Sequence, residues 1–558
     1  MSQSRTFLLI AWLMLAYLLW EAWHASPEVQ PVTATESVPS SATDASVPVS
    51  PTPGSGDEVP VASSGSSAVA DEVIALESVG ANTVSLSNDV LNLELSTQGG
   101  SIVRAELLEY RQNTEAGAPP VVLMSTESGK TFVAQSGLTS AVAEQLPNHL
   151  AQFAVDQTSY RLAEGQDAVE FAMTWQAANG IHVRKIFTLA RGSYVLNVRQ
   201  EIHNGSGEVL GATAYTQIQR DAPKPVGNSF TNPAAYSFVG AAWYSPESKF
   251  DKRKFDDFGD EPLNLAATDG WVAMLEHYFF AAWIPATGVA QDFSTAVVNG
   301  RYLIRSIADA TVAIPVGQTA TIDTRFYVGP KLQDRLEGIA PGLKLTLDYG
   351  VFTVIAQPMA WLLGALHSLT GNWGWAIILL VLLLKGGLFK LSEAQYKSFA
   401  KMRAVQPRIE ALKERYGEDR QKFQTAMMEL YKKEKINPMG GCLPILVQIP
   451  VFISLYWVLI EAVELRHAPW VLWIQNLTAP DPLFVLPVLN LATMWLTQKL
   501  SPSPGMDPMQ KRIMQIMPLA FGVMFAFFPA GLVLYWTTNG ALGLLQQWII
   551  TKRHAPKP

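Results

Sequence analysis

Four long runs without a charged side chain occupy the C-terminal part of this sequence. No Asp, Glu, Lys or Arg occurs in residues 349–384, 436–460, 482–498 or 513–551. A helix that crosses a bilayer needs about 20 predominantly apolar residues, and backbone in lipid must satisfy its own hydrogen bonds. The composition agrees, since only 16% of the 558 residues are charged, against about 25% in soluble domains. The runs therefore predict a bundle of membrane-spanning helices.

The lengths of the runs set the number of spans. The 39-residue run is long enough for two helices, divided at the Phe-Pro-Ala-Gly sequence 528–531, and the 36-residue run for an interfacial amphipathic helix over 349–371 followed by one span. A further apolar stretch, residues 6–20, follows Arg5, and cleavage after Ala25 would put Trp23 where a signal peptidase needs a small residue. We therefore predict an uncleaved signal anchor over 1–25. The other five predicted spans are 372–389, 441–460, 482–498, 513–529 and 531–551.

Charge orients these six predicted spans. Residues 385–437 carry a net charge of +6, residues 499–512 of +2 and the segment after Thr551 of +3. Residues 461–481 carry −2, and residues 26–348 carry −16, with 20 basic and 36 acidic side chains. Because basic loops stay in the cytoplasm, both termini and a hairpin over 391–437 are expected inside, with the acidic region outside. The overall charge of −7 hides this division and argues against a nucleic-acid binder that depends on overall basicity.

The exported part reads as a linker followed by a β domain. Residues 26–72 are rich in Pro, Ser, Thr and Ala and contain no aromatic residue, which is typical of a flexible linker. From about residue 82 the apolar residues alternate, as at Leu91, Leu93 and Leu95. Strands over 169–175 and 181–189 flank an Asn-Gly pair, Asn179-Gly180, that suits a type I′ hairpin turn. The predicted domain is an all-β sandwich over 73–348, with another strand closed by Asn204-Gly205.

Residues that could carry enzymatic chemistry are sparse in the exported part. Its four histidines lack the spacing of a zinc site, and they are His149, His182, His203 and His277. The lone Cys442 excludes an intramolecular disulfide and a multi-cysteine metal site. The mixed acidic and basic segment 249–261 reads as a solvated loop, with calcium or partner binding as the alternative. We predict no metal site, no cofactor and no catalytic residues.

Several long motifs of the C-terminal part resemble one known family. They are GNWGWAIILLVLLLK at 371–385, EAQYKSFAKMRAVQPRIEALKERYG at 393–417, YKKEKINPMGGCLPILVQIPVFISLYWVL at 431–459, DPMQKRIMQIMP at 507–518 and PAGLVLYWTTN at 529–539. Together they resemble the YidC/Oxa/Alb membrane protein insertases, closely so the Gram-negative members. The match covers about residues 350–552, whereas the anchor, the linker and the β domain resemble the family in layout only.

The resemblance implies a multi-domain membrane protein with an N-terminal signal anchor, a periplasmic all-β supersandwich domain and a five-helix membrane bundle with a cytoplasmic helical hairpin. It implies a non-enzymatic insertase and chaperone of the bacterial inner membrane, acting alone or with the Sec translocon through a groove open to cytoplasm and lipid. The implied partners are nascent membrane proteins, the Sec translocon with its accessory SecDF complex, the translating ribosome and membrane lipids, with no small-molecule substrate.

Lys385 is the first candidate for a groove residue. A charge at the end of an apolar run is costly in lipid and marks a functional site, although Lys385 could instead extend its ammonium to the cytoplasmic interface. The family commonly has Arg here, so the bidentate grip of a guanidinium is lost in this chain. A second departure is Lys390, where relatives often have Pro. Further polar or aromatic candidates for the groove are Gln448, Tyr535, Trp536, Thr538, Asn539 and Gln546, each of which could instead serve helix packing.

The hairpin is expected to begin with a capping box formed by Ser392 and Gln395, with helices to about Tyr416 and to Lys435. Its methionines, Met402, Met427 and Met428, could contact apolar nascent segments or only pack the two helices together.

Two other functions remain as alternatives. A secondary transporter would show paired charges near the membrane centre or inverted repeats, and a membrane-anchored periplasmic carbohydrate-active protein would gather His and carboxylate groups in one cleft.

Overall fold

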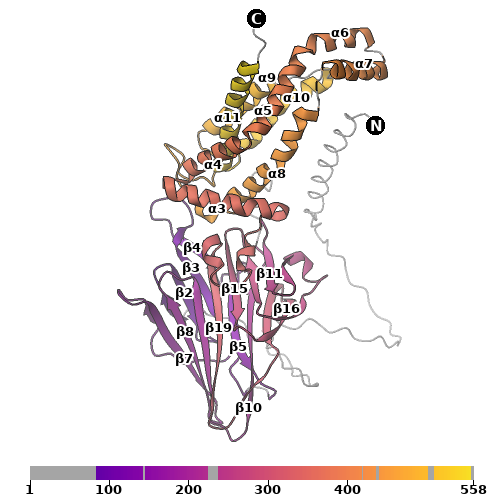
Figure 1. Cartoon of the computed structure of the whole chain (residues 1–558). Helices are drawn as coiled ribbons and strands as arrows, with labels where there is room; N and C mark the ends of the chain where they lie inside the picture. The colour runs from indigo at the N-terminus through magenta and orange to yellow at the C-terminus, as the bar shows by residue number, and fades with distance from the viewer. Residues whose placement is uncertain are drawn as a thin grey trace, which may run out of the picture. The chain divides into compact units, whose positions relative to one another are not determined.

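The computed structural model describes residues 83–142, 145–223, 237–416, 419–434, 436, 439–500 and 508–554. The chain divides into two compact units, Met1–Thr52 and Pro53–Pro558, and every element described here belongs to the second unit. The predicted anchor and linker lie outside the described residues. In chain order the elements are strands first and helices second, which is the predicted sequence of classes (Figure 1).

The larger of two sheets has eleven strands and is antiparallel except where β1 pairs with β6. Its main path runs β13-β16-β17-β10-β5-β3-β2-β1-β6, with β18 beside β10 and β4 beside β3. Its strands are β1 (Thr83–Ser87), β2 (Leu91–Ser96), β3 (Ile102–Arg111), β4 (Pro120–Met124), β5 (Phe132–Thr139), β6 (Ser159–Arg161), β10 (Leu210–Arg220), β13 (Asn264–Thr268), β16 (Ala290–Val298), β17 (Arg301–Ala308) and β18 (Val312–Ile314).

The smaller sheet has eight strands in the order β12-β11-β14-β15-β19-β9-β8-β7. Its strands are β7 (Ala168–Gln176), β8 (Ile181–Ala190), β9 (Val195–Asn204), β11 (Gly240–Ser245), β12 (Lys249–Lys254), β14 (Trp271–Leu275), β15 (Phe279–Pro285) and β19 (Thr319–Pro330). Short helical turns η2 (Phe255–Asp257), α2 (Gln333–Leu336) and η3 (Leu343–Thr346) complete this part.

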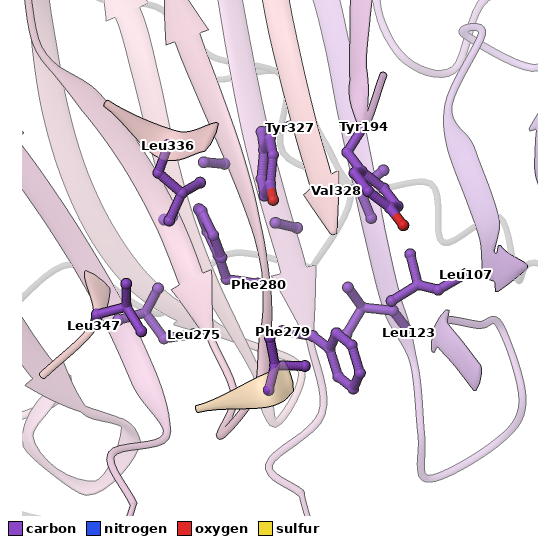
Figure 2. Packing of buried hydrophobic residues seen from close by; sticks show 14 of the residues in the cluster. Leu107, Leu123, Tyr194, Leu275, Phe279, Phe280, Tyr327, Val328, Leu336 and Leu347 are labelled. Carbon is purple, nitrogen blue, oxygen red and sulfur yellow. The ribbon is translucent and has the colours of Figure 1, made fainter. Parts of the chain in front are cut away.

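Apolar residues of both sheets share one core. Leu107 on β3 and Leu123 on β4 belong to the same buried cluster as Phe280 on β15 and Tyr327 on β19 (Figure 2). Full burial of one such side chain stabilises the fold by about 1.5–3 kcal/mol. The region is therefore a two-layer β structure, as the alternating pattern predicted, and on β2 it is the predicted leucines that are completely buried.

Two local predictions in the β region were wrong. The loop between β7 and β8 has four residues, closed by a hydrogen bond from Ala177 N to Ile181 O, and only Gly180 in it has a positive φ (+87°). A type I′ turn needs positive φ at Asn179 as well, so the turn type was wrong. The segment predicted as a solvated loop contains β12, an edge strand paired with β11. Its many charged side chains, mostly lysines, are typical of a protected sheet edge.

Nine helices follow in the described part of residues 353–554. They are α3 (Thr353–Thr370), preceded by the turn η4 (Gly350–Phe352), α4 (Trp373–Gly387), α5 (Phe389–Ala404), α6 (Gln406–Tyr416), α7 (Arg420–Lys433), α8 (Met439–Glu461), α9 (Val485–Leu500), α10 (Pro508–Phe525) and α11 (Ala530–His554). Helices α4, α8, α9, α10 and α11 coincide within a few residues with the five spans predicted after residue 371.

Some of these helices are long and apolar enough to cross a membrane. Among the described residues, Gly350–Thr370 is long and apolar enough to cross one, and α4 with α5 passes the same test as a pair bent by 67°. Leu446–Glu461 and Arg512–Phe525 are apolar but shorter. The predicted interfacial position of 349–371 stays a prediction.

The helix that begins the hairpin does not start where the sequence predicted. Helix α5 begins at Phe389, so Ser392 lies within its first turns, buried, with its N–H bonded to Leu388 O. The capping box was therefore wrong, because the chain resumes a helix directly after the bend. Helices α5 and α6 are separated at Val405, two residues before Pro407, which disfavours a continuous helix. Asp419 caps α7 by accepting hydrogen bonds from Gln421 N and Lys422 N.

A loop of residues 462–484, which includes the turn η5 (Val463–Leu465), connects α8 to α9. Its Asp481 is buried and accepts hydrogen bonds from Trp473 Nε1, Leu483 N and Leu486 N at 2.8–3.0 Å. Main-chain bonds from Ala530 N to Ala479 O and from Gly531 N to Leu477 O join the loop to the start of α11. The starts of α9 and α11 are thus held by one loop.

Candidate functional site

Lys385 lies in the last turn of α4, where that helix packs against α11 and α5 follows after a bend. Its side chain is half-buried, and none of the carboxylates in the described residues comes within 4.0 Å of its ammonium group. Gly386 and Gly387 follow with open space where a Cβ would be. The bend thus leaves a cation beside a helix face without an ionic partner in the described part of the chain.

Three residues surround Lys385 on the neighbouring helices. A Cβ at Gly543 on α11 would lie 3.6 Å from Lys385 Nζ and 3.5 Å from Tyr396 Oη. Tyr396, on α5, donates a hydrogen bond to Gly543 O at 3.1 Å, and Gln546 Nε2 donates to Lys385 O at 3.1 Å. Lys385 and Gln546 are thus brought together as the sequence suggested, and we call these four residues the Lys385 site.

Tyr396 and Gly543 were not among the groove residues predicted from the sequence. Tyr396 comes after the bend, so its distance from Lys385 depends on a tertiary angle that periodicity does not give. Gly543 carries one sequence signal, because Gly540, Ala541 and Gly543 form a run of small residues where helices can approach closely.

Aromatic rings form a layer between α8, α10 and α11. Phe452 of α8 stacks on Trp536 with centroids 5.3 Å apart and lies 5.4 Å from Tyr535. Phe525 of α10 lies 4.2 Å from Trp536. The Trp536 indole N–H and Gln546 Oε1 are buried without a hydrogen-bond partner among the described residues. These unpaired groups leave hydrogen-bonding capacity for water or a polar segment.

The remaining predicted residues of the groove stand apart from Lys385. Gln448 on α8 and Thr538 and Asn539 on α11 are half-buried, and within the described residues no hydrogen bond joins them to the Lys385 site. Tyr535 is buried. The structure brings Tyr535 and Trp536 into the aromatic layer, and Gln546 to Lys385.

The three methionines of the hairpin differ in exposure. Met402 is buried in a cluster with Ile409 and Tyr431, and Met427 packs against that cluster. Met428 is 39% exposed. Two of the three therefore pack the hairpin together, whereas Met428 is exposed.

The described histidines do not converge on a cleft. His149 Nδ1 is bonded to Tyr215 Oη at 2.7 Å, and burial, with the nearby charge of Lys185, lowers the His149 pKa to about 4. His182 and His203 are exposed cross-strand neighbours on β8 and β9. His277 faces Glu461 in a buried setting. Within the described residues no group of three or more His, Cys, Asp or Glu could hold a metal ion.

A hollow in the β region contains no histidine in its lining, which includes Tyr215, Gln291 and Asp323.

Two family models match consecutive parts of the chain. The family described as "YidC periplasmic domain" matches residues 83–362, and the family described as "60Kd inner membrane protein" matches residues 365–557. The boundary falls within α3, so the strands and the helix bundle correspond to separate family models.

Curated relatives cover the whole chain. A protein of Stenotrophomonas maltophilia (strain R551-3) named "Membrane protein insertase YidC" is 46% identical over 573 residues, which cover 100% of this chain and 98% of the relative. A protein of the same name from Xanthomonas campestris pv. campestris (strain B100) is 46% identical over 574 residues with the same coverage. A solved structure titled "Active YidC insertase crystal structure with the first transmembrane domain resolved" covers 85% of this chain and 93% of its own, at 19% identity and a TM-score of 0.38. Identity at this level over the full length shows that the chain belongs to the Gram-negative YidC family.

Proposed function

We propose that this chain inserts, folds and assembles integral proteins of the bacterial inner membrane. The family membership and the names of the relatives support this function. The roles proposed for particular residues rest on the Lys385 site. Its half-buried lysine lies between α4 and α11 and has no ionic partner in the described residues. A lone cation in an apolar bundle attracts a partner of opposite charge and holds water near it.

The physical function we propose is to shorten the apolar path for a polar segment. A polar segment of a nascent protein loses hydration when it enters lipid, and that loss is costly. A cation with unpaired hydrogen-bonding groups beside it offsets part of the loss, and favours acidic segments. Apolar burial of the following span and the membrane potential then supply the driving force. No bond is made or broken, so the proposed activity is not enzymatic.

The rest of the predicted architecture belongs to this proposal. We propose an N-terminal signal anchor, a periplasmic supersandwich and five further spans with both termini in the cytoplasm. We also propose a cytoplasmic hairpin over 391–437 whose Met428 contacts apolar nascent segments. Gln448, Thr538 and Asn539 would line the groove toward lipid. The Sec translocon, SecDF, the ribosome and membrane lipids are the proposed partners.

Reconstitution tests the role of Lys385. Purified full-length protein in liposomes should protect a small membrane protein with an acidic exported segment from external protease. We expect Lys385→Met to reduce the protected fraction at least about fivefold, because removal of one charge-assisted contact costs about 1 kcal/mol or more. Lys385→Glu should also lower photo-crosslinking of the substrate span to α11.

Lys390 offers a matched control, since it is a lysine five residues further along and exposed. Lys390→Met should leave protection and crosslinking unchanged. Equal protection by Lys385→Met and Lys390→Met would show that Lys385 only reaches the interface. No protection by the unaltered protein would contradict the insertion function itself.

A further inference from the structure

A buried ion pair connects the β region to the end of α8. Glu461 is the last residue of α8, and Lys331 directly follows β19. Lys331 Nζ lies 3.8 Å from Glu461 Oε2, and the two side chains are only 2% and 3% exposed. Two charges removed from water to this extent are costly unless each compensates the other.

Other groups of the β region complete the surroundings of Glu461. Ser237 Oγ donates a hydrogen bond to Glu461 Oε1 at 3.0 Å. His277 Nε2 lies 4.0 Å from the same oxygen and donates to Ile460 O at 3.0 Å. Burial, together with the charge of Lys331, lowers the pKa of His277 to about 3. His277 is therefore neutral at pH 7 and acts here as a hydrogen-bond donor to the helix end.

A second contact lies just beyond α8. The guanidinium of Arg466 donates hydrogen bonds to Arg111 O at 2.6 Å and to Gln112 O at 3.1 Å, at the end of β3. The β region therefore holds both the last residue of α8 and the loop that follows it, through contacts that involve each of its two sheets.

Helix α8 also carries Phe452, nine residues before Glu461. Nine residues of helix are about 13.5 Å long, so a small tilt at the Glu461 end moves Phe452 relative to Trp536. The aromatic layer between α8, α10 and α11 has no hydrogen bond across its rings in the described residues. The contact between Phe452 and Trp536 therefore depends on where the ends of α8 are held.

We infer that Glu461, paired with Lys331, is a positioning residue that sets the tilt of α8 and keeps the aromatic layer closed. This inference rests on the proposed function for its importance, because the layer borders the proposed groove. On this inference, the β region helps to position α8 within the helix bundle.

The test compares removal of one charge with removal of both. Lys331→Met alone leaves a buried carboxylate without its cation, which is worse than the loss of both charges in Lys331→Met/Glu461→Gln. We expect the thermal midpoint of Lys331→Met to fall by about 5 °C or more, and that of the double variant to recover at least half of the loss.

Spin labels on the full-length protein in lipid nanodiscs report the position of α8. In a Cys442→Ser background, cysteines replace Leu446 on α8 and Val316 in the β region, which are 66% and 52% exposed. We expect one narrow distance distribution for this labelled parent, a broad one with Lys331→Met, and a narrow one again in the double variant.

Two results would overturn the inference. A narrow distribution in all proteins would mean that the pair stabilises the chain without setting the tilt of α8. A distribution as broad in the double variant as in Lys331→Met would assign the tilt to packing of the lysine rather than to the charge pair. Lys344→Met, at a half-exposed lysine paired with Glu337, controls for loss of a lysine. The measurement needs no substrate, so it stands apart from the insertion assay.

Discussion

Lys385 and Lys185 show that some single residues can be predicted from the sequence as candidate sites far more easily than others. Lys385 is evident because it ends a long apolar run. Lys185 was overlooked, although it shares strand parity with the buried Ile181 and Val183. Its ammonium is completely enclosed and donates to Gly99 O at 2.7 Å and Ser136 O at 2.8 Å. Parity alone gives the direction of a side chain, whereas its partners, in a turn and in β5, come from segments far away in the chain.

The burial of Lys185 predicts a pH dependence of stability. Burial lowers its pKa to about 7 in the folded protein, against about 10.5 when unfolded. Between these values the unfolded chain holds a proton that the folded chain lacks, so stability rises with pH, and below pH 7 the cost is fully present. We expect the thermal midpoint of the parent to rise from pH 7 to pH 10 relative to Lys185→Met. Lys130→Met, at an exposed lysine, should run parallel to the parent, and a parallel curve for Lys185→Met would contradict the prediction.

Gly543 gives a second prediction at this scale. A leucine there would enter the space beside Lys385 Nζ and Tyr396 Oη, which lie within 3.6 Å of the position of its Cβ. Overpacking of this kind costs about 1–3 kcal/mol, so we expect Gly543→Leu to reduce substrate protection in liposomes by about tenfold. Gly543→Ala should be mild, since both contacts are at ordinary van der Waals distance. Ala541→Leu, at an exposed position of the same helix, is the control, and equal activity of both leucine variants would exclude a role for this space.

Elements were predicted better than their ends. The five C-terminal helices and strands such as β2, β7 and β8 follow from hydrophobic runs and alternation, which average over many residues. The wrong details, the Asn179-Gly180 turn and the capping box at Ser392, both depend on how many residues connect two elements. The bend between α4 and α5 decided the second case, because a helix that resumes at Phe389 leaves Ser392 no free helix end to cap.

The start of α5 can be tested with proline. Lys390 is the second residue of α5, where a missing N–H is tolerated and a fixed φ reduces the freedom of the unfolded chain. We expect Lys390→Pro to leave the thermal midpoint unchanged or to raise it by a few degrees. Ser392→Pro should lower stability by about 3 kcal/mol, because the Ser392 N–H is bonded to Leu388 O. Thermal unfolding of the purified proteins measures both, and a large loss with Lys390→Pro would mean that α5 starts earlier.

At the scale of the whole molecule, the sequence predicted the parts and not their attachment. The division into a net charge of −16 over residues 26–348 and of +9 over residues 349–558 follows from counting charges, and it predicts the topology. The pair of Lys331 and Glu461 cannot be read in this way, since 130 positions separate two ordinary charged residues. The charge counts hid this pair, because Glu461 was counted only as part of the net charge of residues 461–481. Long-range pairs of this kind need the fold, and the double variant described above tests this one.

The loop of residues 462–484, which holds the starts of α9 and α11, also bears on the order in which contacts form during synthesis. Asp481 finds all three of its described donors within eight residues, so it can be satisfied as soon as that stretch has been synthesised. The bonds from Ala530 and Gly531 to the same loop must wait about 50 residues more. A ribosome that adds about 5–20 residues per second leaves an interval of several seconds between the two events. During that interval the part of the loop around Asp481 is already satisfied, whereas its main-chain bonds to the start of α11 form only after Ala530 and Gly531 have been synthesised.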